Sequence, residues 1–176
     1  MPNKSTVYFI GLPASAAKVL DYFTANDAVL PSGSAASAKG RNNHPLVIYP
    51  QAQVTPVDFH GVFPDAGIVK VSLLWSSTVN VGNVFWQLAW ERDNPTFFIP
   101  QENLDVDSFA PAKGVVSPAP LGSGFLRETV LTFTKTERGG ILSGEAYRLR
   151  VTRNGIFVLD TMLAEAQLFR VILGSA

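Results

Sequence analysis

The chain has 176 residues, no cysteine, and 14 basic side chains balanced by 14 acidic ones. That length suits one domain, and the zero net charge argues against nucleic-acid binding, which needs a basic excess to neutralise phosphates. The lack of cysteine excludes disulfides, thiolate zinc sites and a cysteine nucleophile, and no apolar run approaches the roughly 20 residues of a membrane span.

The chain changes character near residue 44, which we take as the boundary between an N-terminal arm, 1–44, and a folded domain, 45–176. The arm is rich in Ala, Ser, Gly and Pro, and its stretch Pro31–Gly40 has too few large apolar side chains to bury. Within the arm, a strand over Thr6–Ile10 followed by loop is favoured slightly over a short helix near 16–23, because proline and many small residues weaken the helix. We therefore predict a mostly extended or irregular arm.

From residue 45 onward, apolar and polar side chains alternate with the period of two that is typical of β-strands. The segments with this pattern are Pro45–Tyr49, Val57–Val62, Ile68–Trp75, Val84–Glu91, Glu128–Lys135, Ala146–Arg153 and Ala164–Leu173, with weaker candidates at Thr96–Ile99 and Gly114–Val116. Turn-forming Gly and Asn residues separate the segments. A long proline-rich loop, Asn94–Ser123, interrupts them. The pattern predicts an all-β fold, an antiparallel β-sandwich or jelly roll.

The three tryptophans are the side chains most relevant to a glycan-binding role. Trp75 shares the parity of Val71 and Leu73 in its strand, and Trp86 and Trp90 alternate with further apolar residues. Side chains at alternate positions of a half-buried strand face the same way, so we predict that all three rings lie in the core. Exposed rings would instead be typical of a glycan-binding surface.

Several strands carry apolar side chains on both faces, whereas a monomeric sandwich should be polar outside. The residues that break the parity are Ile68, Leu74, Phe85, Val130 and Phe169. Charged residues make up only 16% of the chain, below the roughly 25% of an ordinary domain. Both features indicate that a partner covers part of the surface, and a closed cyclic homo-oligomer would cover identical faces without forming an open polymer.

No motif predicts an enzyme, a cofactor or a metal. His44 and His60 lack further convergent donors, and Leu104–Ser108 lacks the glycine and distant glutamate of a calcium loop. Gly122–Gly124 lacks the spacing of a nucleophile elbow. A glycosidase needs only two carboxylates, but nothing selects a pair among those available. They are Glu91, Asp93, Glu128 and Glu165.

Two arginines in one predicted strand, Arg148 and Arg150, point to the same face. They are candidates for contact with an acidic partner. The alternative is a solvated strand face on which they form cross-strand charge pairs.

The order of segments resembles that of small jelly-roll structural proteins of tailed phages. The segments that carry the resemblance are Tyr8–Ala16, Pro45–Tyr49, Phe59–Pro64, Asn83–Leu88, Gly144–Arg153 and Asp160–Leu168. They span nearly the whole chain, and the loop 94–123 matches least. The resemblance implies a virion protein on the capsid exterior, made in the host cytoplasm. Its implied role is a capsid cement or decoration protein that bridges major capsid protein subunits, often as a trimer.

On that interpretation the arm docks onto neighbouring chains. Its apolar side chains are Val7, Tyr8, Phe9, Ile10, Leu20 and Phe23, and strand addition would supply the hydrogen bonds that offset the entropy of ordering. The alternative is that the arm folds back and completes its own core. The alternative function is a receptor- or glycan-binding head of a phage fibre or spike.

Overall fold

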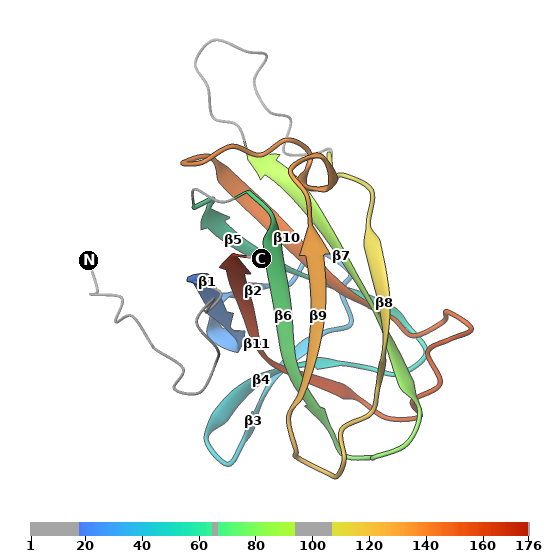
Figure 1. The fold of residues 1–176 in the computed structure, drawn as a ribbon. Helices are drawn as coiled ribbons and strands as arrows, with labels where there is room; N and C mark the ends of the chain where they lie inside the picture. Colours follow the sequence, from blue (N-terminus) through green and yellow to red (C-terminus); the bar gives the residue numbers. More distant parts are fainter. Residues whose placement is uncertain (1–17, 65–66, 94–106, 176) are drawn as a thin grey trace.

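A computed structural model describes residues 18–64, 67–93 and 107–175. They form a sandwich of two antiparallel sheets, so the predicted fold class is confirmed (Figure 1). The elements are β1 (Val19–Thr24), η1 (Ala25–Asp27), β2 (Ala28–Val29), β3 (Ser37–Arg41), β4 (His44–Tyr49), β5 (Val54–Val62), β6 (Val69–Ser77), β7 (Asn83–Asp93), β8 (Lys113–Pro118), β9 (Arg127–Phe133), η2 (Thr136–Arg138), β10 (Ala146–Asn154) and β11 (Ala166–Ser175). The predicted strand Thr96–Ile99 lies outside the described residues.

The two sheets are built mostly from strands that are distant in sequence. One sheet has the order β3-β4-β11-β6-β9, with β1 added beside β11, and the other has the order β2-β5-β10-β7-β8. β10 is central in the second sheet and pairs with β5 and β7 along almost its whole length. Most pairings therefore depend on long-range contacts.

Aromatic rings fill the space between the sheets. Trp75 and Trp86 are fully buried and Trp90 is 1% exposed, so the prediction of buried tryptophans is confirmed. Trp86 lies edge-on to Trp75 and Tyr49, with ring centroids 5.8 and 5.1 Å away. The Trp75 indole donates a hydrogen bond of 2.8 Å to the Thr129 hydroxyl. These rings are part of the hydrophobic core and are not available to a ligand.

The prediction of an arm over 1–44 does not hold from residue 19 onward. β1 pairs with β11, β2 pairs with β5, and β3 forms a hairpin with β4. The sequence of this stretch predicts strands only weakly. It is nevertheless β-structure because its backbone hydrogen-bonds to strands that have a clear apolar pattern of their own. The helix considered near 16–23 is a strand from Val19, and the proposed Thr6–Ile10 strand lies outside the described residues.

The last strand contains a β-bulge that changes its predicted parity. The register between β11 and β6 shifts between Leu168 and Arg170. Phe169 is therefore an extra residue, and both it and Arg170 project away from the core, while Leu168 and Val171 are buried in it. Simple alternation would place Phe169 and Val171 on one face. A bulge re-aims side chains in this way.

Candidate functional site

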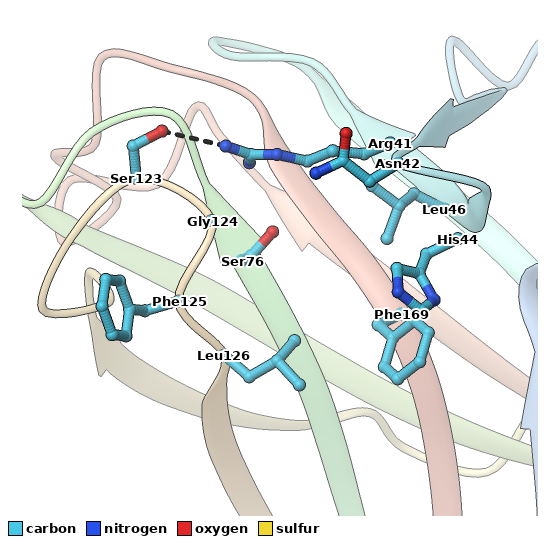
Figure 2. A pocket seen from close by; sticks show the side chains of 10 residues that line it. All are labelled: Arg41, Asn42, His44, Leu46, Ser76, Ser123, Gly124, Phe125, Leu126 and Phe169. Atoms are coloured by element: carbon cyan, nitrogen blue, oxygen red, sulfur yellow. Dashed lines mark hydrogen bonds between the residues drawn. The ribbon is translucent and has the colours of Figure 1, made fainter.

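A cavity of about 490 Å³ opens on the outer face of the six-stranded sheet (Figure 2). The residues that line it are Arg41, Asn42, His44, Leu46, Ser76, Ser123, Gly124, Phe125, Leu126 and Phe169. We call this cavity the outer-face pocket. Its floor comes from β4, β6 and β11, because Leu46, Ser76 and Phe169 point away from the core. A pocket that combines apolar walls with a few polar groups is typical of small-molecule binding.

The β3–β4 hairpin forms one wall of the pocket. Its two-residue turn uses Asn42 and Asn43, which have φ values of 46° and 65°. Asparagine tolerates this left-handed backbone, and the resulting tight turn matches the twist of the strands. The hairpin places Arg41 directly opposite His44. The His44 ring in turn lies edge-on to Phe169, with centroids 5.6 Å apart. The tight turn therefore places the Arg41 guanidinium and the His44 imidazole at the same opening.

The loop 119–126 forms the opposite wall. The Gly124 N–H donates to the Ser77 carbonyl at 3.0 Å, and the Phe125 N–H donates to the Gly122 carbonyl at 3.1 Å. The first bond holds the loop against the end of β6, and the second closes a turn within the loop. Even so, the Phe125 ring remains 66% exposed. Figure 2 shows this ring across the opening from His44 and Phe169.

Arg41 lies between the two walls. Its Nη1 donates to the Gln167 Oε1 at 3.0 Å, and its Nη2 donates to the Ser123 Oγ at 3.0 Å. Gly124 has a φ of 82°, and a Cβ added there would lie 2.8 Å from the Arg41 Nη2. Glycine at 124 therefore has two effects. It tolerates the positive φ, and it lets the Arg41 guanidinium approach the backbone closely. Of these pocket residues, the sequence drew attention only to His44, Phe169 and the Gly122–Gly124 stretch, none of them as part of a pocket, and it carried no local signal for Arg41.

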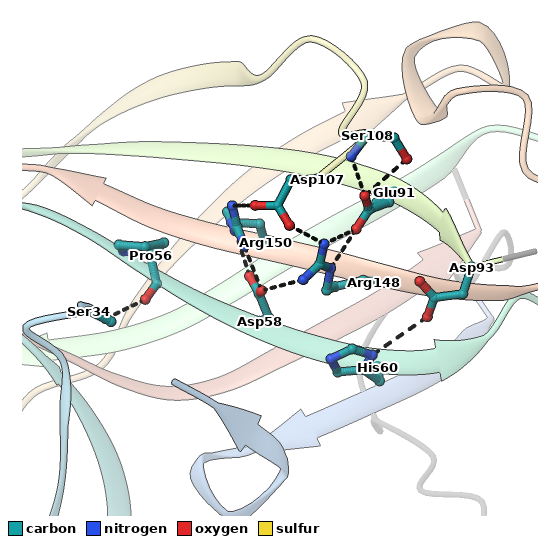
Figure 3. A network of polar contacts seen from close by, with 10 residues as sticks. All are labelled: Ser34, Pro56, Asp58, His60, Glu91, Asp93, Asp107, Ser108, Arg148 and Arg150. Atoms are coloured by element: carbon teal, nitrogen blue, oxygen red, sulfur yellow. Dashed lines mark hydrogen bonds and ion pairs between the residues drawn. The ribbon is translucent and has the colours of Figure 1, made fainter. Parts of the chain in front are cut away.

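Arg148 and Arg150 are engaged by carboxylates of the chain itself, on the outer face of the other sheet (Figure 3). Arg150 forms ion pairs with Asp58 and Asp107, both at 2.8 Å. Arg148 contacts Asp58, Asp107 and Glu91, and Glu91 also accepts hydrogen bonds from Ser108. We call these residues the arginine cluster. The cross-strand charge pairs weighed as the alternative are present, and contact of Arg148 and Arg150 with an acidic partner stays a prediction.

The arginine cluster also stacks on an aromatic ring. Both guanidinium groups lie over Phe109, at 4.7 Å for Arg148 and 4.1 Å for Arg150. The hydrogen bond from Arg150 lowers the pKa of Asp107, despite some opposition from burial. The hydrogen bond to Asp58 raises the pKa of Arg150. The cluster therefore clamps the segment that begins at residue 107 onto the sheet, which is a structural role.

The apolar residues predicted to dock onto other chains are only partly described. Val7, Tyr8, Phe9 and Ile10 lie outside the described residues. Phe23 is 5% exposed and packs on Phe59 at 5.6 Å, and Leu20 lies against the same core. These two side chains complete the chain's own core because β1 pairs with β11, so the docking role predicted for Phe23 is wrong.

A second exposed feature is the loop between β10 and β11. Its apolar side chains in solvent are Ile156, Phe157, Val158, Leu159 and Leu163, with exposures from 38% to 81%. The loop is nevertheless held firmly, because the buried Arg153 pairs with the buried Asp160 at 2.7 Å and donates to the carbonyls of Met162 and Ala164. Large exposed apolar patches mark interaction surfaces.

The described residues provide no cluster of three or more His, Asp or Glu side chains suited to a metal ion. Within the same residues, no helix is long and apolar enough to cross a membrane. Of the carboxylates considered for a glycosidase pair, Glu91 is buried and bound to Arg148. Asp93 lies 3.6 Å from His60.

No protein-family model and no curated protein matches this chain. The family 35 carbohydrate binding module from Clostridium thermocellum has a similar fold, with a TM-score of 0.58 and 14% identity over 89% of this chain and 99% of that one. An exo-beta-1,3-galactanase from Phanerochaete chrysosporium matches 87% of this chain with a TM-score of 0.55 and 11% identity. An isomalto-dextranase from Arthrobacter globiformis T6 matches 86% of this chain with a TM-score of 0.52 and 15% identity. This chain spans only 29% and 22% of those two enzymes. The similarity shows that the sandwich is a jelly roll.

Proposed function

We propose that this chain is a non-catalytic binding module that recognises a saccharide in the outer-face pocket. The observation that carries the proposal is that an exposed aromatic residue, Phe125, and several polar side chains line the same pocket. The C–H face of a sugar ring is apolar and packs on an aromatic ring, while its hydroxyls need donors and acceptors at the edge. Arg41, Asn42 and Ser123 supply such groups.

The pocket supports this function over that of a glycosidase. The described pocket residues include no aspartate or glutamate, the residues that most glycosidases use as acid, base or nucleophile. The solved structures of similar fold include a protein named as a carbohydrate binding module, and two glycan-degrading enzymes share the fold over a fraction of their length. The composition of the pocket is our reason for proposing a binding module.

Phe125→Ala should weaken saccharide binding about fivefold, because one stacked ring is worth roughly 1 kcal/mol. The experiment is a glycan-array screen of the wild-type chain, followed by NMR titration of the best ligand into ¹⁵N-labelled wild-type and variant protein. The matched control is Phe157→Ala, since Phe157 is a partly exposed ring that packs on Phe85 in the other sheet. The control should bind like the wild type.

Tryptophan fluorescence, recorded with the same saccharide, provides a further check of where the ligand binds. All three tryptophans are buried, so their emission should not shift when the pocket fills. Amide shifts should instead cluster at the β3–β4 hairpin and the loop 119–126. Shifts confined to another surface, or equal losses in both phenylalanine variants, would contradict the proposed site.

A second candidate function, capsid cement, follows from the resemblance to tailed-phage structural proteins. The observation that favours it is the firmly held apolar loop between β10 and β11, where Val158 is 81% exposed and Leu163 is 79% exposed. A rigid apolar loop loses little entropy on binding, so it is suited to a permanent interface. We propose that copies of the chain associate through this loop as a homotrimer on the outside of the virion shell.

For the second candidate, light scattering should give a particle of three 19.0 kDa chains. Val158→Asp should shift the population toward the monomer, because it puts a charge into the apolar contact. The control is Val62→Asp, at the far end of β5 from this loop, which should leave the mass unchanged. A 19.0 kDa particle for the wild type, with or without purified capsid shells, would rule out this function.

A further inference from the structure

We infer that the ligand of the outer-face pocket is an acidic sugar whose carboxylate binds Arg41. The inference rests on the proposed saccharide function and adds the chemical class of the ligand. It follows from the partners of Arg41, from the charges around the pocket, and from how the guanidinium is held.

Arg41 differs from the ion-paired arginines in the described part of the chain because both of its hydrogen-bond partners are neutral. Gln167 and Ser123 accept its two bonds. By contrast, four other arginines each form an ion pair with a carboxylate of the chain. They are Arg92, Arg148, Arg150 and Arg153. The positive charge of Arg41 is therefore not compensated within the described residues of the pocket, none of which is acidic.

The guanidinium is also fixed in place before any ligand arrives. Its acceptor Gln167 is 4% exposed, and the Gln167 Oε1 is held from a second side by the Ser76 hydroxyl at 3.1 Å. Gly124 packs close to the Nη2, as its missing Cβ allows. A guanidinium has five N–H donors, and the bonds to Gln167 and Ser123 leave others free. A fixed guanidinium with free donors binds a carboxylate with little loss of entropy.

A second cation adds to the positive potential near the pocket. The bulge in β11 projects Arg170 outward beside Phe169, and its guanidinium lies 4.7 Å from the centre of that ring. No described carboxylate forms an ion pair with Arg170 in this structure. Phe125 and Phe169 offer apolar surface to a sugar ring, and Arg41 offers a partner to its acid group. A carboxylate attached to a pyranose satisfies both features at once.

The test compares matched ligands that differ only at the acid group. D-glucuronate, D-galacturonate and D-mannuronate are each titrated beside their methyl esters and their neutral parent sugars, with ¹⁵N-labelled full-length protein at 20 and 200 mM salt. At least one uronate should bind about tenfold or more tightly than its ester, because a charge-assisted hydrogen bond replaces a neutral one. The preference should shrink at high salt.

The variants separate the charge from the pocket. Arg41→Gln should abolish the preference for acid over ester, whereas Arg41→Lys should keep part of it because the charge remains. Lys135→Gln removes an exposed charge far from the pocket and should change nothing. Circular dichroism and thermal melting establish that each variant is folded.

The possible failures are distinguishable. If neutral sugars shift the pocket amides as strongly as the uronates, the acidic class is wrong and the saccharide function stands. If none of these sugars and no array glycan shifts the pocket amides, the proposed function falls and this inference falls with it. If acetate alone binds as tightly as the uronates, the site binds any carboxylate and the acidic-sugar class is overturned.

Discussion

Arg153→Met should lower the free energy of unfolding by about 3–5 kcal/mol, the cost of leaving a buried charge without its partner. Arg153 is fully buried, and the side chain of its partner Asp160 is 1% exposed. Methionine preserves much of the volume but cannot pair with the carboxylate. The loss would be a large share of the stability of an ordinary domain.

The other hydrogen bonds of Arg153 add to the expected loss of stability. Besides Asp160, the guanidinium donates to the carbonyl oxygens of Tyr49, Ala164 and Met162. It therefore links the end of β4 and the β10–β11 loop to β10. Its loss leaves buried carbonyls without a donor as well.

Urea titration followed by tryptophan fluorescence measures this loss. Arg170→Met is the matched control, since Arg170 is exposed and should cost no more than about 1 kcal/mol. Arg153→Met combined with Asp160→Asn should recover part of the loss by removing the unpaired charge. A single variant within 1 kcal/mol of the wild type would mean that the pair does not hold the loop.

Arg148→Met should cost about 3 kcal/mol, toward the lower end of the same range, because the Arg148 side chain is itself 22% exposed. Its main partner, Glu91, is 2% exposed and contacts no other described cation. Asp58 is less affected, because Arg150 still pairs with it at 2.8 Å. The destabilising element is therefore the buried Glu91 carboxylate.

A double-mutant cycle tests this assignment. Glu91→Gln in the Arg148→Met background should restore stability, because a neutral amide can keep the hydrogen bonds from Ser108 without a buried charge. Hydrogen exchange should also show faster opening of the segment from residue 107, which the arginine cluster holds. If Arg150→Met proves more damaging than Arg148→Met, Asp58 rather than Glu91 is the critical carboxylate.

Local periodicity is enough to predict the strands of the core and the side chains that they bury. Alternation at Trp75, Trp86 and Trp90 placed these rings correctly because each lies in a regular strand with one face on the core. The predicted Ala146–Arg153 strand matches β10 almost residue for residue. Periodicity is local information, and it suffices where burial on one face decides which side chains point inward.

The N-terminal strands, the bulge and the pocket depend instead on long-range contacts. The strands between Val19 and Arg41 carry weak local signals and form because β11, β5 and β4 offer them hydrogen bonds. The bulge at Phe169 breaks the alternation where β11 exchanges β4 for β1 as its neighbour. The outer-face pocket joins residue 41 to residue 169 through contacts that no spacing in the sequence encodes. Such contacts depend on which strands become neighbours, and that choice is made only when the whole sandwich closes around its core.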